Sequence, residues 1–428
     1  MSDIASKDAG AAPSVVIDNI TACRICGSEQ LEDVIDLGTQ RITSRWPVYG
    51  DFSTPSTPIS LCACQQCHLL QLRQTTFASE LYEYSYGYRS GISNTMRSHL
   101  LEYQQEIVSK VTLNDNDIVV DIGSNDSTML QHYDSRLRRV GIDPTGSQFA
   151  QYYGDVQLLP TYFCEDVFVK AFPGGQKAKI VSSISMFYDL PDPVQFAKDI
   201  EAVLAEDGVW TCEQSYMPMM VDTNSVDTIC HEHLEYYGLK QIKLIADKAN
   251  LKIIDLQFNS CNGGSSRLYF AKKSSSLVAK NADLVESVLR TEDEYYKNGN
   301  EYYREFMRKC DAEVAKLRQF VVSENAKGKV FHIYGASTKG NCTLQYADLG
   351  ESLIPFAVER NPDKAGKMTA TGIPIIMEEE MRRSPPDYLL VLPWHFRDEI
   401  VVREKEFRDN GGKMVFPFPH FEVVGADA

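Results

Sequence analysis

The amino-acid sequence predicts an α/β protein with a largely parallel central sheet and a smaller domain on either side of it. Residues 117–126 read Asp-Ile-Val-Val-Asp-Ile-Gly-Ser-Asn-Asp, which is typical of a buried strand that runs into a tight turn. Strand-like and helix-like stretches alternate from there to residue 216, and this alternation favours a parallel sheet covered by helices. Two Cys-x-x-Cys pairs precede this part and a second strand-and-turn unit follows it, so we expect three domains.

Length and composition are those of a folded multidomain protein. The chain has 428 residues, of which 43% are hydrophobic and 24% are charged. A net charge of −16 argues against nucleic acid as a partner, because neutralising phosphates requires clustered Lys and Arg. The N-terminal stretch lacks the basic start and apolar core of a signal peptide, and no apolar run has the length of a membrane span. We therefore expect a cytoplasmic monomer that binds neither membranes nor nucleic acid.

Four cysteines near the N-terminus have the spacing of a zinc site. Cys23 and Cys26 form one Cys-x-x-Cys pair, Cys64 and Cys67 form another, and each pair can hold one side of a tetrahedral ion. Four thiolates leave no open coordination position, so we expect a structural zinc ion. Cys62 is a weaker substitute for Cys64. The odd total of 11 cysteines, without an export signal, indicates a reducing compartment.

The turn after the strand at 118–122 has the features of a cofactor site. Gly123 has no Cβ, so a ligand can lie against its backbone, and amide groups at the start of the next helix point toward that ligand. A second strand ends at Asp143, where a carboxylate can hold the two ribose hydroxyls of a nucleoside. The loop 123–126 lacks the three-glycine spacing of a dinucleotide site, which favours S-adenosylmethionine over NAD.

Later strands of the same sheet extend this site. Ligands of parallel sheets lie at the carboxyl ends of the strands, and the strands predicted at 179–183 and 208–214 bring further polar residues to that edge. The residues that we expect to bind the cofactor are Asp121, Gly123, Ser124, Asn125, Asp126, Asp143, Pro144, Ser185, Met186 and Glu213.

The segment 227–237 contains the densest group of reactive side chains, His231-Glu232-His233. This spacing is not the His-Glu-x-x-His of helical zinc proteases, so acid–base work fits it better than metal binding. An imidazole can act as a base near neutral pH when a carboxylate or tyrosine fixes its tautomer.

A tyrosine-rich segment at 81–91 precedes a helix that we predict at 93–111. Its alternating Ser, Gly and Arg residues are more typical of a loop than of a strand. Phenols and a guanidinium in such a loop suit a sugar or a nucleotide base.

The last third of the chain predicts a packing helix and a second Rossmann-like unit. Apolar residues in the charged region 276–327 recur at three- and four-residue steps, which is typical of an amphipathic helix. A strand at 329–335 then enters a helix through Gly-Ala-Ser-Thr-Lys-Gly, a turn that could hold a phosphate. The residues of the apolar stripe are Phe306, Cys310, Val314, Leu317 and Val321.

Together these motifs resemble those of the sugar-nucleotide C-methyltransferases, a three-domain, zinc-containing family. The zinc pairs, the Ile-Gly-Ser-Asn-Asp loop and the His-Glu-His segment carry the resemblance, together with four further motifs. These are Met-Phe-Tyr-Asp at 186–189, Glu-Gln-Ser-Tyr at 213–216, Asn-Gly-Gly-Ser at 262–265 and Tyr-Gly-Ala-Ser-Thr-Lys-Gly-Asn at 334–341. The resemblance implies a zinc-binding domain at 1–75, a class I (Rossmann-like) methyltransferase core at 76–272 and a Rossmann-like nucleotide-sugar-binding domain at 273–428.

The same resemblance implies methylation at C3 of a nucleotide-linked 4-keto-6-deoxyhexose, with dTDP or GDP as the nucleotide. It makes His233 the base, with Glu232 and His231 beside it. The C3 proton is acidic because the C4 oxygen can carry the charge, so the site also needs donors to that oxygen. The candidate donors are Tyr86, Tyr88 and Tyr237. The residues that we expect to bind the sugar nucleotide are Arg89, Asn262, Tyr334, Ser337, Lys339, Asn341, Glu359, Arg360 and His395.

Two positions depart from the family pattern. Members that make antibiotic sugars have Tyr directly before His-Glu-His, where this chain has Cys230, which leaves the identity of the sugar open. The cofactor loop has Ser127 where the family often has Gly, a change that we expect to be tolerated.

Two other functions stay open at this point. One is an NAD-dependent oxidoreductase that uses the Gly335 loop on a nucleotide sugar, and the other is a non-catalytic, zinc-stabilised nucleotide-binding scaffold. Retained S-adenosylhomocysteine in the purified protein would support the methyltransferase, and retained NAD the oxidoreductase. Intact zinc with neither ligand would favour the scaffold.

Overall fold

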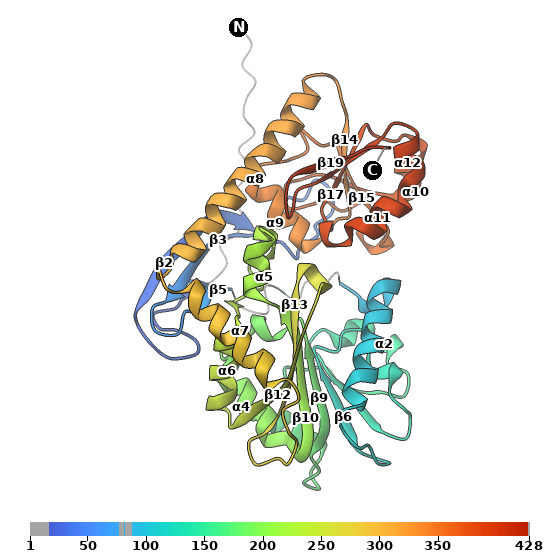
Figure 1. Ribbon diagram of the computed structural model, residues 1–428. Coiled ribbons are helices and arrows are strands. Elements are labelled where there is room, and N and C mark those ends of the chain that lie inside the picture. Colours follow the sequence, from blue (N-terminus) through green and yellow to red (C-terminus); the bar gives the residue numbers. More distant parts are fainter. Residues whose placement is uncertain (1–16, 77–80, 82–87, 427–428) are drawn as a thin grey trace.

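The computed structural model describes residues 17–76, 81 and 88–426, which form three connected parts (Figure 1). Within these residues the strands make a central sheet, an N-terminal sheet, a C-terminal sheet and a small pair of β1 (Ile17–Asn19) with β5 (Gln74–Thr76). The α/β class predicted from the sequence is confirmed. Among the described residues, no helix is both long and apolar enough to cross a membrane.

The central sheet is mixed but mainly parallel. From edge to edge it runs through β12 (Leu251–Asn259), β13 (Ser265–Lys272), β10 (Leu204–Ser215), β9 (Ala178–Ile184), β6 (Ile118–Ile122), β7 (Arg138–Ile142) and β8 (Gln157–Leu159). Strand β13 pairs antiparallel with β10 and β12, whereas β6 to β10 pair in parallel. The carboxyl ends of β6, β7, β9 and β10 therefore meet at one edge.

Helices cover both faces of the central sheet (Figure 1). Successive side chains of a strand point to opposite faces, so Val119 joins the core under α2 (Asn94–Val108) and Val120 joins the core on the other side. Ser93 begins α2 by accepting a hydrogen bond from the Met96 N–H, as expected of an N-cap residue. The helices of the opposite face are α3 (Glu165–Ala171), α4 (Pro193–Val203) and α6 (Leu239–Lys248).

The N-terminal sheet takes its last strand from the middle of the chain. Its antiparallel order is β11 (Glu235–Tyr236), β4 (Leu70–Leu72), β3 (Ser56–Cys64) and β2 (Leu31–Arg41). Because β11 begins two residues after His233, the His-Glu-His segment is anchored in this sheet rather than in the central one.

Arg24, which lies in the first Cys-x-x-Cys turn, stabilises the junction between β4 and β11. Its buried guanidinium lies 3.5 Å from the Glu235 carboxylate and donates hydrogen bonds to the carbonyls of Leu72 and Leu234, at 2.8 and 3.4 Å. It also donates to the Thr75 hydroxyl at 2.8 Å. These bonds satisfy a buried cation with groups from both sides of the junction.

The C-terminal sheet is a second Rossmann-like unit. Its order is β16 (Ile375–Met377), β15 (Phe356–Glu359), β14 (Phe331–Tyr334), β17 (Tyr388–Val391), β18 (Lys413–Phe416) and β19 (Glu422–Val424), with β19 antiparallel to β18 and the other pairs parallel. Successive strands are added to one side of β14 as far as β16 and then to its other side from β17 on, and such sheets bind ligands at this switch point. Its helices are α9 (Thr338–Tyr346), α10 (Glu378–Arg383), α11 (Arg397–Arg403) and α12 (Lys405–Asp409).

Two helices lead from the central sheet to this unit. Helix α7 (Ala282–Tyr295) packs beside α6, and the long α8 (Glu301–Asn325) passes β2 and reaches the C-terminal part (Figure 1). The five residues of the predicted apolar stripe are all buried on α8, so this prediction is confirmed.

Some local predictions differ from the structure. The helix expected after Ser127 is reduced to the 3₁₀ turn η2 (Leu130–His132), because Asn125 and Ser127 adopt left-handed backbone angles, with φ of 50° and 60°. Strand β10 begins directly after α4. The remaining short elements are α5 (Met217–Asp222), η1 (Ser90–Ile92), η3 (Gly146–Tyr152), η4 (Phe187–Asp189), η5 (Val226–Thr228), η6 (Cys261–Gly263), η7 (Pro362–Lys364) and η8 (Trp394–Phe396).

Candidate functional site

The four paired cysteines converge on one point. Their sulfur atoms lie within 4.8 Å of one another, with 3.5 Å between Cys23 and Cys67 and between Cys26 and Cys64. A tetrahedral ion with Zn–S bonds of about 2.3 Å places its ligands about 3.8 Å apart, so the spacing fits zinc. Cys62 is fully buried in β3 and stands outside this group.

The backbone of the cofactor loop and of the neighbouring turn at Ser185 adopts left-handed angles at several residues. Gly123 has φ of +71°, and a Cβ there would come within 3.1 Å of the Met186 side chain. Asn125, Ser127 and Ser185 also have positive φ values although they carry side chains. A positive φ in a residue other than glycine costs free energy, and several such residues close together are typical of ligand sites. The absence of a side chain on Gly123 therefore lets Met186 pack against the backbone of the loop.

The polar side chains of the loop hold the loop itself. Asn125 accepts a hydrogen bond from the Ser90 N–H and donates to the Tyr88 carbonyl, at 3.0 and 3.1 Å. Asp126 accepts from the Gly91 N–H at 2.9 Å, and the Ser124 hydroxyl donates to Tyr153 at 2.8 Å. These side chains pin residues 88–91 against the loop.

The two acids of the expected ribose site differ in environment. Both oxygens of Asp143 accept protein hydrogen bonds at 2.7 Å, from the Asn125 N–H and from Thr145. Oδ1 accepts from both the N–H and the hydroxyl of Thr145, so Oδ2 is the oxygen that keeps a second lone pair for a ribose hydroxyl. Asp121 is buried within β6, and burial raises its pKa to about 7 although Ser182 donates to it. Pro144 is exposed beside Asp143.

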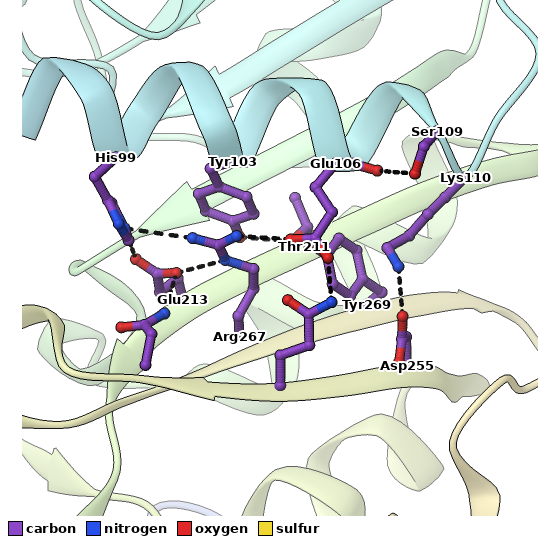
Figure 2. A network of polar contacts seen from close by, with 12 residues as sticks. His99, Tyr103, Glu106, Ser109, Lys110, Thr211, Glu213, Asp255, Arg267 and Tyr269 are labelled. Atoms are coloured by element: carbon purple, nitrogen blue, oxygen red, sulfur yellow. Dashed lines mark hydrogen bonds and ion pairs between the residues drawn. The ribbon is translucent and has the colours of Figure 1, made fainter.

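Glu213 lies in a buried network beneath α2 (Figure 2). His99 and Arg267 contact its two oxygens at 2.5 and 2.6 Å, and Asn259 donates at 2.8 Å. Burial alone would lower the pKa of His99, but hydrogen bonds with Cys261 and Glu213 outweigh it and raise that pKa to about 10. Both carboxylate oxygens of Glu213 therefore have protein partners. Through His99, Glu213 holds α2 in place beside the site.

His99, Glu213 and Cys261 offer ligand atoms within 4.8 Å of one another, as a metal site would. The Arg267 guanidinium, however, is already paired with Glu213 and lies 3.4 Å from the His99 ring nitrogen. A bound cation would face this fixed charge at close range, so we assign no metal to the group.

His233 is held in the tautomer that a base needs. Its Nδ1 lies 2.7 Å from the Thr228 carbonyl, which can only accept, so Nδ1 carries the proton and Nε2 keeps its lone pair. Burial lowers the pKa of His233 to about 4, with Glu232 opposing this shift and Lys339 adding to it. Its ring rests against Tyr188, with 4.2 Å between centroids. The imidazole is therefore neutral at neutral pH.

The other predicted catalytic residues are turned elsewhere. His231 is buried against the N-terminal sheet, and Glu232 accepts a hydrogen bond from Thr43 at 3.2 Å. Tyr237 stacks on Phe187 in the core, with 5.5 Å between ring centroids. Tyr88 is 49% exposed beside the cofactor loop. Tyr86 lies outside the described residues.

Three of the predicted sugar-nucleotide residues come together between the central and C-terminal sheets. The Lys339 ammonium donates to the Asn262 carbonyl at 2.8 Å, and the Asn262 amide donates to the Ser185 hydroxyl at 3.2 Å. His395 lies near the same ammonium, and its pKa is lowered to about 3 by burial and by Lys339.

The remaining predicted substrate residues do not face this junction. Tyr334 donates to Glu404, Asn341 bridges Thr43 and Ala370, and Ser337 caps α9. Glu359 accepts the Ala336 N–H in the loop after β14, Arg360 is exposed, and Arg89 packs on Tyr152.

The sequence interpretation missed His99, Arg267 and Asp227. A signal for His99 was present, because His99, Tyr103, Glu106 and Lys110 form a polar stripe at helical spacing on the face of α2 that meets the sheet (Figure 2). Arg267 and Asp227 gain their roles through contacts with residues distant in the chain, and local patterns carry no sign of these.

Three family models match consecutive parts of the chain. They describe a zinc binding domain at 23–82, a methyltransferase domain at 96–256 and a C-methyltransferase C-terminal domain at 260–419. The C-methyltransferase NovU of Streptomyces niveus is 28% identical over 419 residues, which cover 96% of this chain and 99% of that protein.

Solved structures align with part of the chain. An S-adenosylmethionine-dependent methyltransferase from Clostridium acetobutylicum matches with a TM-score of 0.34 and 10% identity, covering 41% of this chain and 92% of its own. Magnesium protoporphyrin IX methyltransferase from Synechocystis matches with a TM-score of 0.30 and 11% identity, covering 41% and 79%.

The matched domains and the cysteine cluster define an S-adenosylmethionine-dependent methyltransferase with a zinc-binding N-terminal domain. The chain is therefore a methyltransferase, and not an oxidoreductase or a non-catalytic scaffold. The chain is similar to the C-methyltransferases along almost its whole length, because the zinc-binding, methyltransferase and C-terminal models follow one another along it and NovU matches 96% of it.

The first prediction concerns the metal. Cys26→Ser should reduce the zinc content from one ion per chain and lower the thermal stability of the N-terminal domain, because binding free energy at such a site is folding free energy. Cys62→Ser is the matched control and should keep the zinc. Metal analysis and thermal unfolding of both variants check this, and a zinc-replete, stable Cys26→Ser protein would contradict the assignment.

The second prediction concerns the cofactor. Asp143→Ala should weaken S-adenosylhomocysteine binding by about 1.5–3 kcal/mol per lost hydrogen bond, because a carboxylate makes strong bonds to ribose hydroxyls. Asp155→Ala removes a largely exposed carboxylate of the same domain that pairs with Arg139, and it should leave binding unchanged. Isothermal titration calorimetry measures both. Unchanged affinity in Asp143→Ala would move the ribose contact to another acid, with Asp121 next.

Proposed function

We propose that this enzyme methylates C3 of a nucleotide-linked 4-keto-6-deoxy sugar, with His233 as the base that removes the C3 proton. The observation that carries the proposal is the neutral imidazole of His233, whose Nδ1 proton is committed to the Thr228 carbonyl. The resemblance of the sequence motifs to sugar-nucleotide C-methyltransferases supports the sugar and the carbon position.

The arrangement of the two Rossmann-like sheets supports a substrate in two parts. Loops at the carboxyl ends of the central sheet meet loops of the C-terminal sheet, where Lys339 bonds Asn262 and a Cβ on Gly263 would come within 3.0 Å of Trp394. Ligands of such sheets lie at these ends. In this proposal the central sheet holds the cofactor and residues 273–428 hold the nucleotide, so that one chain is sufficient.

The residues around His233 support proton removal. A carbon beside a ketone loses a proton when a base accepts it and the ketone oxygen takes up the charge. Nε2 of His233 is the acceptor, and the Lys339 ammonium favours the negative charge that develops on the sugar. S-adenosylmethionine supplies the methyl group as a sulfonium salt. The Gly123 loop and Met186 then keep the donor and the acceptor carbon in line, which accounts for much of the acceleration.

The third prediction separates proton removal from methyl transfer. Wild-type enzyme with bound S-adenosylhomocysteine should exchange the C3 proton of a 4-keto sugar nucleotide for deuterium from the solvent. His233→Asn cannot accept the proton near neutral pH, so exchange and methylation should both fall by about 10²–10⁴-fold.

His231→Asn is the matched control, because His231 faces the N-terminal sheet, and exchange should persist in it. Exchange is followed by NMR of the recovered sugar nucleotide, with dTDP- and GDP-linked substrates compared. Full exchange in His233→Asn, or its loss in His231→Asn alone, would exclude His233 as the base.

The fourth prediction follows from the lowered pKa of His233. With a pKa of about 4, the imidazole stays deprotonated as the pH falls from 8 to about 6, so kcat/KM should show no acid limb in that range. Because Lys339 contributes to the lowering, Lys339→Met should move the acid limb to higher pH. A wild-type limb centred near the ordinary value for histidine, about 6.5, would contradict this environment.

A further inference from the structure

Trp394 connects the C-terminal sheet to the base. It follows β17 at the switch point of that sheet, and its indole N–H donates to the Asp227 carboxylate at 2.9 Å. Asp227 belongs to η5, whose last residue, Thr228, accepts the Nδ1 proton of His233 at 2.7 Å. Two direct hydrogen bonds and one peptide unit therefore separate the C-terminal domain from the imidazole.

The ring of Trp394 is held on several sides. Gly263 leaves space for it, since a Cβ at that position would lie 3.0 Å from the indole. Phe418 and His395 meet the ring edge-on, with centroids 6.3 and 5.8 Å away. The indole is 6% exposed and Asp227 1%, so the bond between them is shielded from water. A shielded bond to a carboxylate transmits position more firmly than an exposed one.

An open groove lies on the other side of Trp394. It has a volume of about 330 Å³ and is lined by Trp394, His395, Arg397 and Pro419, with neighbouring residues of α11. This volume is within the range of small-molecule sites. A ligand in the groove would touch the same side chain that bonds Asp227.

We propose that Trp394 and Asp227 are positioning residues, which set the orientation of His233 through Thr228. This proposal rests on the proposed role of His233. A base displaced by about 1 Å from its acceptor geometry loses on the order of 100-fold in rate, so a loose η5 segment would slow proton removal while the substrate still binds.

The experiment compares three variants of the full-length, zinc-bound enzyme. Trp394→Phe removes the indole N–H but keeps an aromatic ring. Asp227→Asn keeps an oxygen that can accept the indole N–H, and so serves as the conservative variant. Trp210→Phe is the matched control, because the buried Trp210 also donates one indole hydrogen bond, to Ser183 at 3.0 Å, but does so inside the central sheet.

The first readout is the imidazole itself, observed by NMR of the protein labelled with 15N-histidine and assigned with His233→Asn. In the wild type and in Trp210→Phe the Nδ1 proton of His233 should exchange slowly with water. In Trp394→Phe it should exchange at least about tenfold faster, and in Asp227→Asn it should stay close to the wild type. An unchanged Nδ1 proton in Trp394→Phe would overturn the proposal.

The second readout is catalysis with a 4-keto sugar nucleotide. Trp394→Phe should lower kcat and the rate of deuterium exchange at C3 together by about 10–100-fold, with less than a threefold change in KM and in S-adenosylhomocysteine affinity. A rise in KM alone would make Trp394 a binding residue and overturn the positioning role. A changed Nδ1 proton with unaltered exchange at C3 would instead overturn His233 as the base, so the two failures are distinguishable.

Discussion

The pairing of β11 with β4 is the interaction on which the rest of the structure depends. Two residues, Glu235 and Tyr236, place the His-Glu-His segment in the N-terminal sheet, although it follows the last parallel strands of the central one. The zinc-site cysteines lie near β11 in the same part of the structure: Cys64 ends β3, and Arg24, between Cys23 and Cys26, contacts both β4 and β11. The cysteine cluster and the His-Glu-His segment are therefore linked through Arg24 and the pairing of β4 with β11.

This arrangement divides the His-Glu-His residues between two surroundings. His231 and Glu232 turn toward the N-terminal sheet, while His233 turns back to Thr228 and Tyr188 at the edge of the central sheet. The Glu232 side chain thus bonds the segment to the N-terminal domain, whereas the His233 ring lies at the edge of the central sheet.

The sequence was sufficient for those features that depend on local pattern. Four cysteines with two-residue gaps, a buried strand before Gly123 and an apolar stripe on α8 each follow from spacing, and the structure has them. The sequence did not predict features that depend on contacts between segments far apart in the chain. Nothing near Glu213 indicates that His99 and Arg267 occupy its oxygens, and a strand of two residues such as β11 is too short for a periodicity to mark it.

His99 and His233 show how strongly the hydrogen-bond partner of a histidine determines its protonation state. His99 lies 2.5 Å from a buried carboxylate, and its pKa rises to about 10, so it is a cation that balances Glu213. His233 is paired with a neutral carbonyl instead, and burial together with Lys339 takes its pKa to about 4. Had the carboxylate of Glu232 bonded His233 as Glu213 bonds His99, the imidazole would be held protonated and could accept nothing. The hydrogen bond from Thr43 holds the Glu232 carboxylate against the N-terminal domain, so His233 stays neutral.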